Sequence, residues 1–284
     1  MQFVCPKVHW DMHNKQYYFI SGLPRSGSTL LSAILKQNPD FYADITSPVS
    51  GIIQSAIDGI TGSENNLNLN EERRKAILTS IFGGYYSFTE TPVVFDTSRE
   101  WTSKTSILKA LFPYTKILCC VRDIGWILDS FERISSKNPF HSNTLVPQDK
   151  NVNVFSRCDA MMDQNGGIIM SVWALLQEGY ALNPDMIKLI EYDDLCKNPE
   201  KIMKSVYKFI DKPYYEHDFD NVEYSNENFD LSCNLKDLHT VRKKVEWVER
   251  KSILPSEVWK KYSNMEFWRP NYKNNKLEPL LDYK

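Results

Sequence analysis

The stretch Tyr17–Leu31, which reads YYFISGLPRSGSTLL, decides the fold. Its first four residues form an apolar run typical of a buried strand. A turn with glycines at Gly22 and Gly27 follows, and the apolar stripe from Leu30 to Leu35 is typical of an amphipathic helix. A strand, a glycine turn and a helix in this order present backbone N–H groups and a helix N-terminus to one point. The sequence therefore predicts a loop that holds a phosphate-like anion.

This loop differs from the nucleotide-triphosphatase loop G-x-x-x-x-G-K-[ST] at one position. Gly22, Gly27 and Thr29 match that pattern, but Ser28 stands where the lysine would be. The cation lies three residues earlier, at Arg25. Because the lysine supplies the main charge to the β- and γ-phosphates, ATP–Mg hydrolysis is not expected, whereas an anionic ligand still is.

A second motif begins about a hundred residues later. Arg122 follows the apolar run Ile117–Val121, at the sheet edge where open α/β folds bind ligands. Ser130 lies eight residues on, along a predicted helix. Arg122 and Ser130 can therefore converge on a second anionic group. The alternative is that Arg122 pairs with a neighbouring carboxylate, Asp123 or Asp129.

The rest of the chain alternates strand-like and helix-like segments. Further strands are predicted at Val93–Phe95 and Ile187–Ile190, and further helices begin at Asn70 and at Asn198. This alternation predicts an α/β fold with a central parallel sheet flanked by helices.

The domain organisation follows from the same pattern. We predict one domain over residues 1–284, with a nucleotide-binding core at 15–210 and a C-terminal lid and aromatic tail at 211–284. Two polar stretches, Lys137–Asp163 and Asp211–Asp237, are predicted to be long loops.

Composition restricts the function classes. The 284 residues carry a net charge of −2, which argues against a general nucleic-acid-binding protein. No apolar run reaches the ~20 residues of a membrane span. The N-terminus lacks the apolar stretch of a signal peptide, so a cytoplasmic location is expected. The six cysteines include no C-x-x-C pair, and neither a disulfide framework nor a metal site is expected.

Together the two motifs resemble those of the sulfotransferases that use 3′-phosphoadenosine 5′-phosphosulfate (PAPS), most closely the protein-tyrosine and carbohydrate branches. The resemblance implies a P-loop NTPase-like sulfotransferase fold and PAPS as co-substrate without a metal. It implies that the 5′-phosphosulfate is held by Arg25, Ser26, Gly27, Ser28 and Thr29, and the 3′-phosphate by Arg122 and Ser130. The segment Ile190–Leu195 resembles one in which a tyrosine, here Tyr192, lies near the nucleotide.

The resemblance is incomplete at the general base. Arg25 is expected to stabilise the leaving group. Where protein-tyrosine sulfotransferases carry a catalytic glutamate, this chain has Thr46, with Asp44 two residues short. Where the small-molecule branch uses a histidine, it has Asp96, with Arg99 beside it as an anion ligand. Asp96 is the predicted base, with Asp44 and His239 as alternatives.

A basic cluster in the C-terminal part completes the predicted site. Arg242 or Lys243 is expected to contact the 3′-phosphate, as the lid of this family would place them, unless they lie on a solvated helix face.

The resemblance implies an acceptor with a hydroxyl group, which is a protein tyrosine, a sugar or a small molecule, and the sequence does not indicate the oligomeric state. Two other functions remain: a P-loop kinase-like phosphotransferase, and a catalytically inactive nucleotide-binding protein of the same fold.

Overall fold

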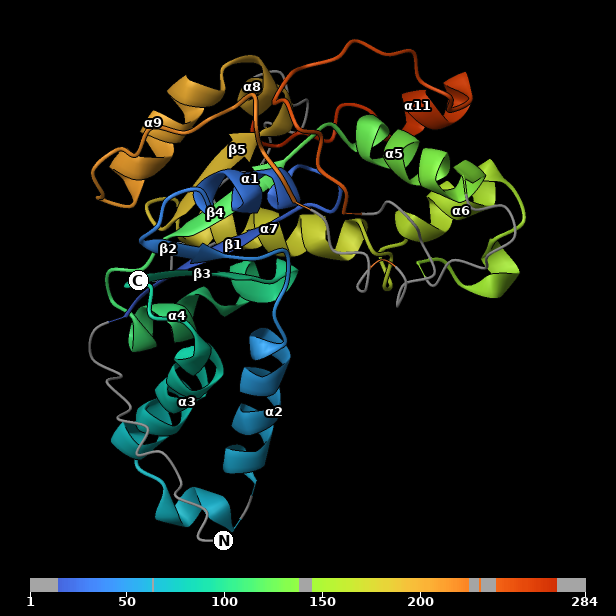
Figure 1. The fold of residues 1–284 in the computed structure, drawn as a ribbon. Helices are drawn as coiled ribbons and strands as arrows, with labels where there is room; N and C mark the ends of the chain where they lie inside the picture. Colours follow the sequence, from blue (N-terminus) through green and yellow to red (C-terminus); the bar gives the residue numbers. More distant parts are fainter. Residues whose placement is uncertain (1–14, 63, 138–144, 225–229, 231–238, 270–284) are drawn as a thin grey trace, which may run out of the picture.

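The computed structural model describes residues 15–62, 64–137, 145–224, 230 and 239–269, and its centre is a five-stranded sheet (Figure 1). The strands are β1 (Gln16–Gly22), β2 (Phe41–Ala43), β3 (Val93–Thr97), β4 (Ile117–Val121) and β5 (Ile187–Glu191). Their order is β2-β3-β1-β4-β5, and every pairing is parallel. The predicted α/β fold with a central parallel sheet is confirmed. The short strand β2 was not predicted.

The strands are buried on both faces, which explains their continuous apolar sequences. All five residues of β3 and of β4 are buried. In β1, Tyr17 and Phe19 belong to the core on one face, and Tyr18 and Ile20 to the core on the other. This alternation is the two-residue period of a strand.

Helices cover both faces of the sheet. One core includes side chains of α1 (Ser28–Leu35), α8 (Tyr192–Lys197) and α9 (Pro199–Phe209). The other includes side chains of α3 (Glu71–Tyr85), α4 (Thr105–Leu111) and α7 (Met170–Leu182). In Figure 1, α8 and α9 lie above the sheet, and α3 and α4 below it.

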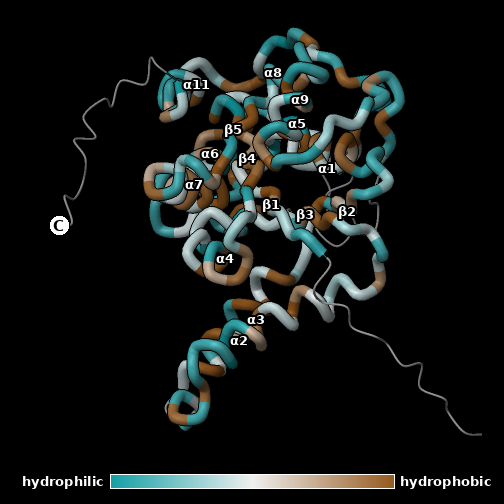
Figure 2. The backbone as a smooth tube through the Cα atoms, turned by 90° about the vertical axis from the view of Figure 1, so that its left-hand side faces the viewer, coloured by the Kyte–Doolittle hydropathy of each residue, from teal (hydrophilic) through white to brown (hydrophobic). Residues whose placement is uncertain are grey.

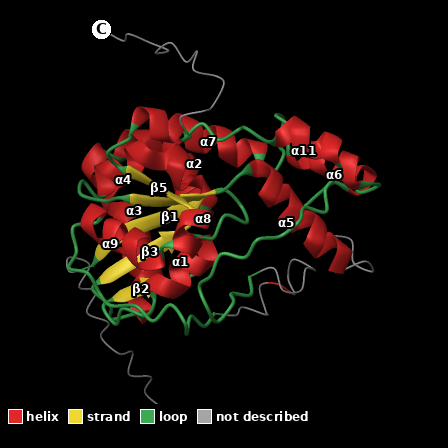
Figure 3. Cartoon of the chain, turned by 90° about the horizontal axis from the view of Figure 1, so that it is seen from above, coloured by secondary structure: helices red, strands yellow, loops and turns green. Residues whose placement is uncertain are grey.

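A second group of helices lies to one side of the sheet: α5 (Ile124–Lys137), α6 (Val154–Met161) and α11 (Ser256–Tyr262) (Figures 1 and 3). Helix α6 corrects the prediction of one long loop over Lys137–Asp163. Its N-terminus is a capping box, in which the Asn153 side chain accepts from the Ser156 backbone N–H at 3.0 Å. A helix of eight residues between polar segments has too short an apolar pattern to be recognised in the sequence.

Helices α2 (Val49–Thr61) and α3 project together from the body (Figures 1 and 2). The 3₁₀ turn η1 (Asn65–Asn68) lies between them, and the other 3₁₀ turns are η2 (Tyr86–Phe88), η3 (Arg99–Lys104) and η4 (Gln148–Lys150). Helix α2 was not predicted. In the part of the chain that the structure describes, no helix is long and apolar enough to cross a membrane.

The predicted lid and tail, 211–284, lies partly outside the described residues. Its described parts include α11, and the backbone N–H of Val222 donates to the Lys243 carbonyl at 2.7 Å. The described cysteines are buried free thiols: Cys119, Cys120, Cys158 and Cys196. Cys5 and Cys233 lie outside the described residues.

Candidate functional site

A cavity of about 270 Å³ lies at the carboxyl edge of the sheet. Its walls come from segments directly after β1, β3, β4 and β5 and from residues 239–250. This is the edge where parallel α/β sheets bind ligands. Among the predicted site residues, those that line the cavity are Arg25, Gly27, Ser28, Thr29, Arg122, Ser130, Tyr192 and Arg242. The two motifs, separated by a hundred residues, therefore meet in one cavity.

The glycines of the first loop allow a close approach that other residues would prevent. Gly22 has φ = 111°, and a Cβ there would lie 2.1 Å from the Cys120 carbonyl oxygen. Gly27 has φ = 98°, and its Cβ would lie 2.8 Å from the Tyr192 ring. Only glycine adopts such backbone without strain. The loop is therefore packed directly against β4 and against the residue that follows β5.

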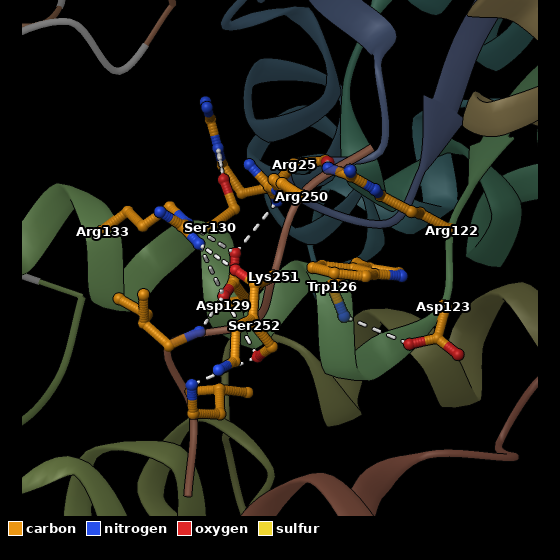
Figure 4. A network of polar contacts seen from close by, with 12 residues as sticks. Arg25, Arg122, Asp123, Trp126, Asp129, Ser130, Arg133, Arg250, Lys251 and Ser252 are labelled. Carbon is orange, nitrogen blue, oxygen red and sulfur yellow. Dashed lines mark hydrogen bonds and ion pairs between the residues drawn. The ribbon is translucent and has the colours of Figure 1, made fainter. Parts of the chain in front are cut away.

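Arg25 itself has left-handed backbone, with φ = 58°. For a residue other than glycine this conformation costs about 1 kcal/mol or more, and such strain clusters at functional sites. The Arg25 Nε donates to Ser130 Oγ at 3.1 Å, which joins the first motif to the second (Figure 4). Burial, with the charge of Arg122 nearby, lowers the pKa of Arg25 to about 10. A guanidinium in this position is suited to an anion that neutralises it.

Arg122 is held by a ring rather than by a carboxylate. Its guanidinium lies 4.1 Å from the centre of the Tyr192 ring, within cation–π distance. Its buried Nε has no hydrogen-bond partner among the described residues. The two carboxylates weighed as partners are used differently, since Asp129 pairs with Arg133 and Arg250, and Asp123 accepts from the Trp126 backbone N–H. The predicted pairing of Arg122 with a neighbouring carboxylate is not observed among these residues.

Two predicted ligands do not face the cavity. The buried Ser26 hydroxyl donates to the Cys120 carbonyl at 2.7 Å and contacts the Leu23 carbonyl, so this side chain fixes the loop. Lys243 does not line the cavity, although its neighbours Arg242 and Lys244 do.

The structure argues against Asp96 as the general base. Asp96 is fully buried within β3 and does not line the cavity. Its Oδ2 accepts from Tyr86 and Ser47 at 2.6 and 2.7 Å, and its Oδ1 accepts from the Trp101 indole N–H at 2.8 Å. Burial raises the pKa of this carboxyl, while the three hydrogen bonds act against the rise. Asp96 therefore has a structural role as a hydrogen-bond acceptor, and the hydroxyl group of a substrate in the cavity would not reach it.

The first alternative, Asp44, is also engaged away from the cavity. Its Oδ1 accepts from the Tyr224 hydroxyl at 2.7 Å and from the Ile45 backbone N–H at 2.7 Å. It does not line the cavity.

The second alternative, His239, does line the cavity. Its Nδ1 lies 2.6 Å from Oδ1 of the buried Asp230, whose Oδ2 accepts from the His239 backbone N–H at 3.0 Å. Because an ionised carboxylate only accepts, Nδ1 donates, and Nε2 carries the lone pair of the neutral ring. Burial lowers the pKa of His239; Asp230 opposes this, and the charges of Arg25 and Arg99 add to it. The lowered pKa favours the neutral imidazole, and the Asp230 carboxylate fixes its tautomer.

The cavity also contains basic residues that were not assigned to the site from the sequence. Lys244 lies at its rim, where it also pairs with Asp220 at 2.9 Å. Arg250, which the sequence analysis did not assign to the site, lines the cavity. Its position depends on Asp129, 121 residues earlier, so no local pattern could reveal it. Arg99, expected from the sequence as an anion ligand, lines the cavity as well.

Comparisons with known proteins identify the family of this chain. The model of the sulfotransferase family matches residues 18–216. The sulfotransferase of Alicyclobacillus acidocaldarius is 13% identical, with 72% of this chain and 84% of that chain covered and a TM-score of 0.48. The sulfotransferase domain of the Synechococcus PCC 7002 olefin synthase is 20% identical, with 72% and 76% covered and a TM-score of 0.42. A search of curated proteins finds no match. Because the family model spans most of the chain, this protein belongs to the sulfotransferase family.

Proposed function

We propose that this protein transfers a sulfuryl group from PAPS to a hydroxyl acceptor. The observation that carries the proposal is that one cavity receives both the loop after β1 and the Arg122–Ser130 pair after β4. PAPS has two anionic groups on its ribose, the 5′-phosphosulfate and the 3′-phosphate. The cavity is lined by cationic side chains from both motifs, which fits a ligand with two anionic groups.

The 5′-phosphosulfate would occupy the loop after β1. The backbone N–H groups at Gly27 and Ser28 lie at the start of α1, where the helix dipole favours an anion. Arg25 would neutralise the charge that develops on the leaving phosphate oxygen. The 3′-phosphate would lie against Arg122 and Ser130, with Tyr192 holding the Arg122 guanidinium in place. Arg242 lies on the lid side of the same cavity.

His239 is the group that we assign as general base, in place of Asp96. The acceptor oxygen forms a bond to sulfur as the bond between sulfur and the 5′-phosphate oxygen breaks. The hydroxyl proton passes to Nε2 of His239, while Asp230 stabilises the imidazolium through Nδ1. 3′-Phosphoadenosine 5′-phosphate leaves. This assignment rests on the position of His239 in the cavity and on the buried carboxylate that orients it.

The test is a product assay. The protein is incubated with PAPS and a panel of phenols, sugars and aliphatic alcohols in the presence of EDTA, and both the released 3′-phosphoadenosine 5′-phosphate and the sulfated acceptor are measured by mass spectrometry. We expect stoichiometric formation of both products. Phosphorylated products formed only with ATP and Mg²⁺ would identify a phosphotransferase instead. Binding of PAPS without turnover on any acceptor would favour the inactive nucleotide-binding protein.

A further inference from the structure

The last described residues, 265–269, form a C-terminal segment that follows α11 and is fastened to the end of β5. Trp268 Nε1 donates to Glu191 Oε1 at 2.6 Å, and Arg269 donates to both oxygens of the same carboxylate, at 2.8 and 2.9 Å. Glu191 is the last residue of β5 and directly precedes Tyr192, which lines the cavity. One end of the C-terminal segment is therefore fixed beside the cavity wall.

The same segment meets the second motif through a pair of carboxyl groups. Glu266 is 5% exposed, and its side chain is hydrogen-bonded to that of Asp123. Asp123 directly follows Arg122, and its Oδ1 accepts from the Trp126 backbone N–H at 3.1 Å (Figure 4). Asp123 therefore caps the start of α5, a position that favours a negative charge. Because ionised carboxylates only accept, a hydrogen bond between the two groups requires a proton, and Glu266 is the donor.

The surroundings of Glu266 favour this protonated form. Burial raises the pKa of Glu266 to about 7, and the hydrogen bond and charge of Asp123 add to the rise, whereas the charge of Arg269 opposes it. Arg269 is itself paired with Glu191 at the end of β5. Glu266 Oε1 is buried and has no hydrogen-bond partner among the described residues. An ionised Glu266 would therefore place a second negative charge beside Asp123 without full compensation.

The two fastening points are sequence neighbours of two residues that meet in the cavity. Asp123 follows Arg122, Glu191 precedes Tyr192, and the Arg122 guanidinium lies 4.1 Å from the centre of the Tyr192 ring. Helix α11 packs on the same turn, since a Cβ at Gly125 would lie 2.9 Å from the ring of an α11 tryptophan. The C-terminal segment and α11 therefore restrain the chain on both sides of this cation–π contact.

We propose that Glu266 is a positioning residue for Arg122 and Tyr192, and that it fastens the C-terminal segment in its protonated form. Loss of the proton makes the two adjacent carboxylates repel each other, which favours detachment of the segment and removes support from Arg122. The fastening itself is independent of the ligand, and only its consequence for the 3′-phosphate rests on the proposed function.

The direction of the pH dependence follows from the two states of the segment. In the detached segment the Glu266 carboxyl would have its ordinary pKa of 4.5, and in the fastened segment a pKa of about 7. Between these values the fastened segment holds a proton that the detached segment has released. Detachment therefore becomes more favourable as the pH rises from 4.5 to 7, and its equilibrium constant should increase about 10-fold between pH 6 and pH 8.5.

Hydrogen exchange of the full chain tests the proton. The backbone N–H of Arg269 donates to the Glu266 carbonyl at 3.0 Å, so exchange of a peptide that covers 265–269 reports on the segment. Glu266→Gln keeps a neutral donor and cannot titrate. Wild type and variant are compared by mass spectrometry at the same pH, and we expect the ratio of their exchange rates to rise about 10-fold from pH 6 to pH 8.5. Glu257→Gln, at an exposed carboxyl on α11, is the matched control and should exchange like wild type. A ratio that is the same at both pH values would overturn the inference.

The positioning role is tested with two ligands that differ at the 3′ position. Dissociation constants of 3′-phosphoadenosine 5′-phosphate and of adenosine 5′-phosphosulfate, which has no 3′-phosphate, are measured by calorimetry at pH 7. For Glu266→Ala we expect binding of the bisphosphate to weaken about 10-fold, as for the partial loss of one charged hydrogen bond, and binding of the phosphosulfate to change less than about 3-fold. Glu266→Gln should restore wild-type binding, and Glu257→Ala should leave both constants within about 3-fold.

Equal losses for both ligands, or no loss in Glu266→Ala, would overturn the positioning role and leave the proposed function intact. Failure of the wild-type protein to bind the bisphosphate would instead contradict the proposed function. The exchange ratio decides the proton-dependent fastening in either case, because it is measured without a ligand.

Discussion

The cavity has two walls that differ in how the sequence encodes them. The sheet wall consists of the loop after β1 and of Arg122 after β4, each contiguous with a buried strand. The outer wall consists of residues 239–250, which have no regular structure. Backbone hydrogen bonds join it to residues 219–224, and the buried carboxylates of Asp230 and Asp129 bind His239 and Arg250 at its two ends. The first wall is fixed by the backbone of the sheet, whereas the second also depends on buried carboxylates.

The two walls are expected to tolerate different substitutions. Replacement of a glycine in the sheet wall would introduce a clash with backbone or with a ring, as at Gly22 and Gly27. Replacement of Asp129 or Asp230 in the outer wall would leave the backbone unstrained but would leave a buried cation or imidazole without its partner. We therefore expect the sheet wall to control binding and leaving-group chemistry, and the outer wall to control proton transfer and the discrimination of ligands.

The largest expected effect is at the centre of the sheet wall. Arg25→Ala should lower the rate of sulfuryl transfer about 10³-fold, because it removes the cation at the leaving phosphate oxygen. Single-turnover rates at saturating PAPS measure this loss. Arg25→Lys, which keeps the charge but not the fork of donors, is the control and should lose less. A rate within 10-fold of wild type in Arg25→Ala would remove Arg25 from the chemistry.

The corresponding residue of the outer wall is His239. His239→Gln should lower the rate about 10²-fold or more, the usual contribution of a general base. Burial lowers the pKa of His239 from 6.5 despite the opposing effect of Asp230, so wild-type activity should fall only as the pH drops below 6.5. The pH profile of kcat/KM measures this acidic limb, and the limb should be absent from His239→Gln.

Asp230→Asn tests the same assignment of the acidic limb to His239. Asp230 raises the pKa of His239, so its loss should move the acidic limb to lower pH as well as slow the reaction. If the acidic limb of the pH profile is unchanged in both His239→Gln and Asp230→Asn, another titrating group is responsible for it.

A smaller effect on stability is expected beside the outer wall, at His217. This buried ring packs among Tyr207, Tyr214, Tyr215 and Phe219. Burial lowers its pKa to about 4, so between pH 6.5 and 4 the unfolded chain binds a proton that the folded chain does not. The free energy of unfolding should therefore decrease as the pH is lowered from 6.5 to 4, by at most about 3 kcal/mol. Urea unfolding at pH 7 and pH 4.5 should show a smaller difference in His217→Phe than in wild type.

The smallest effect on activity is expected at Asp96. Asp96→Asn replaces an acceptor of three buried hydrogen bonds and should cost about 1–3 kcal/mol of stability. The rate per folded molecule should be unchanged, because Asp96 does not reach the cavity. Denaturant unfolding and turnover measured on the same sample separate the two effects. A 100-fold loss of rate at unchanged stability would restore Asp96 as the base.

The sheet wall could be read from the sequence because each of its parts follows an apolar strand in a short, contiguous segment. The anion-binding site was predictable from two short segments, the spacing from Gly22 to Thr29 and the eight-residue step from Arg122 to Ser130. The outer wall could not be read in this way. Asp129 has the same sequence surroundings whether it pairs with Arg122, as weighed above, or with Arg133 and Arg250, as observed.

The sequence could not distinguish a general base from a structural carboxylate at Asp96, for a related reason. A carboxylate at the end of a strand has the same pattern whether it faces a ligand or accepts from Ser47, Tyr86 and Trp101. The burial of the carboxylate and its hydrogen-bond partners distinguish the two roles, and the sequence shows neither because both depend on the fold. The single-domain organisation over 1–284 and the roles of the ligands remain predictions.

The most direct test of the central claim, that the two walls form one site for a doubly anionic nucleotide, is calorimetric titration of the wild-type protein with 3′-phosphoadenosine 5′-phosphate in EDTA. We expect one site per chain, with affinity weakened both by Arg25→Ala in the first motif and by Arg122→Ala in the second. Heat of binding with ATP and Mg²⁺, and none with the bisphosphate, would contradict it.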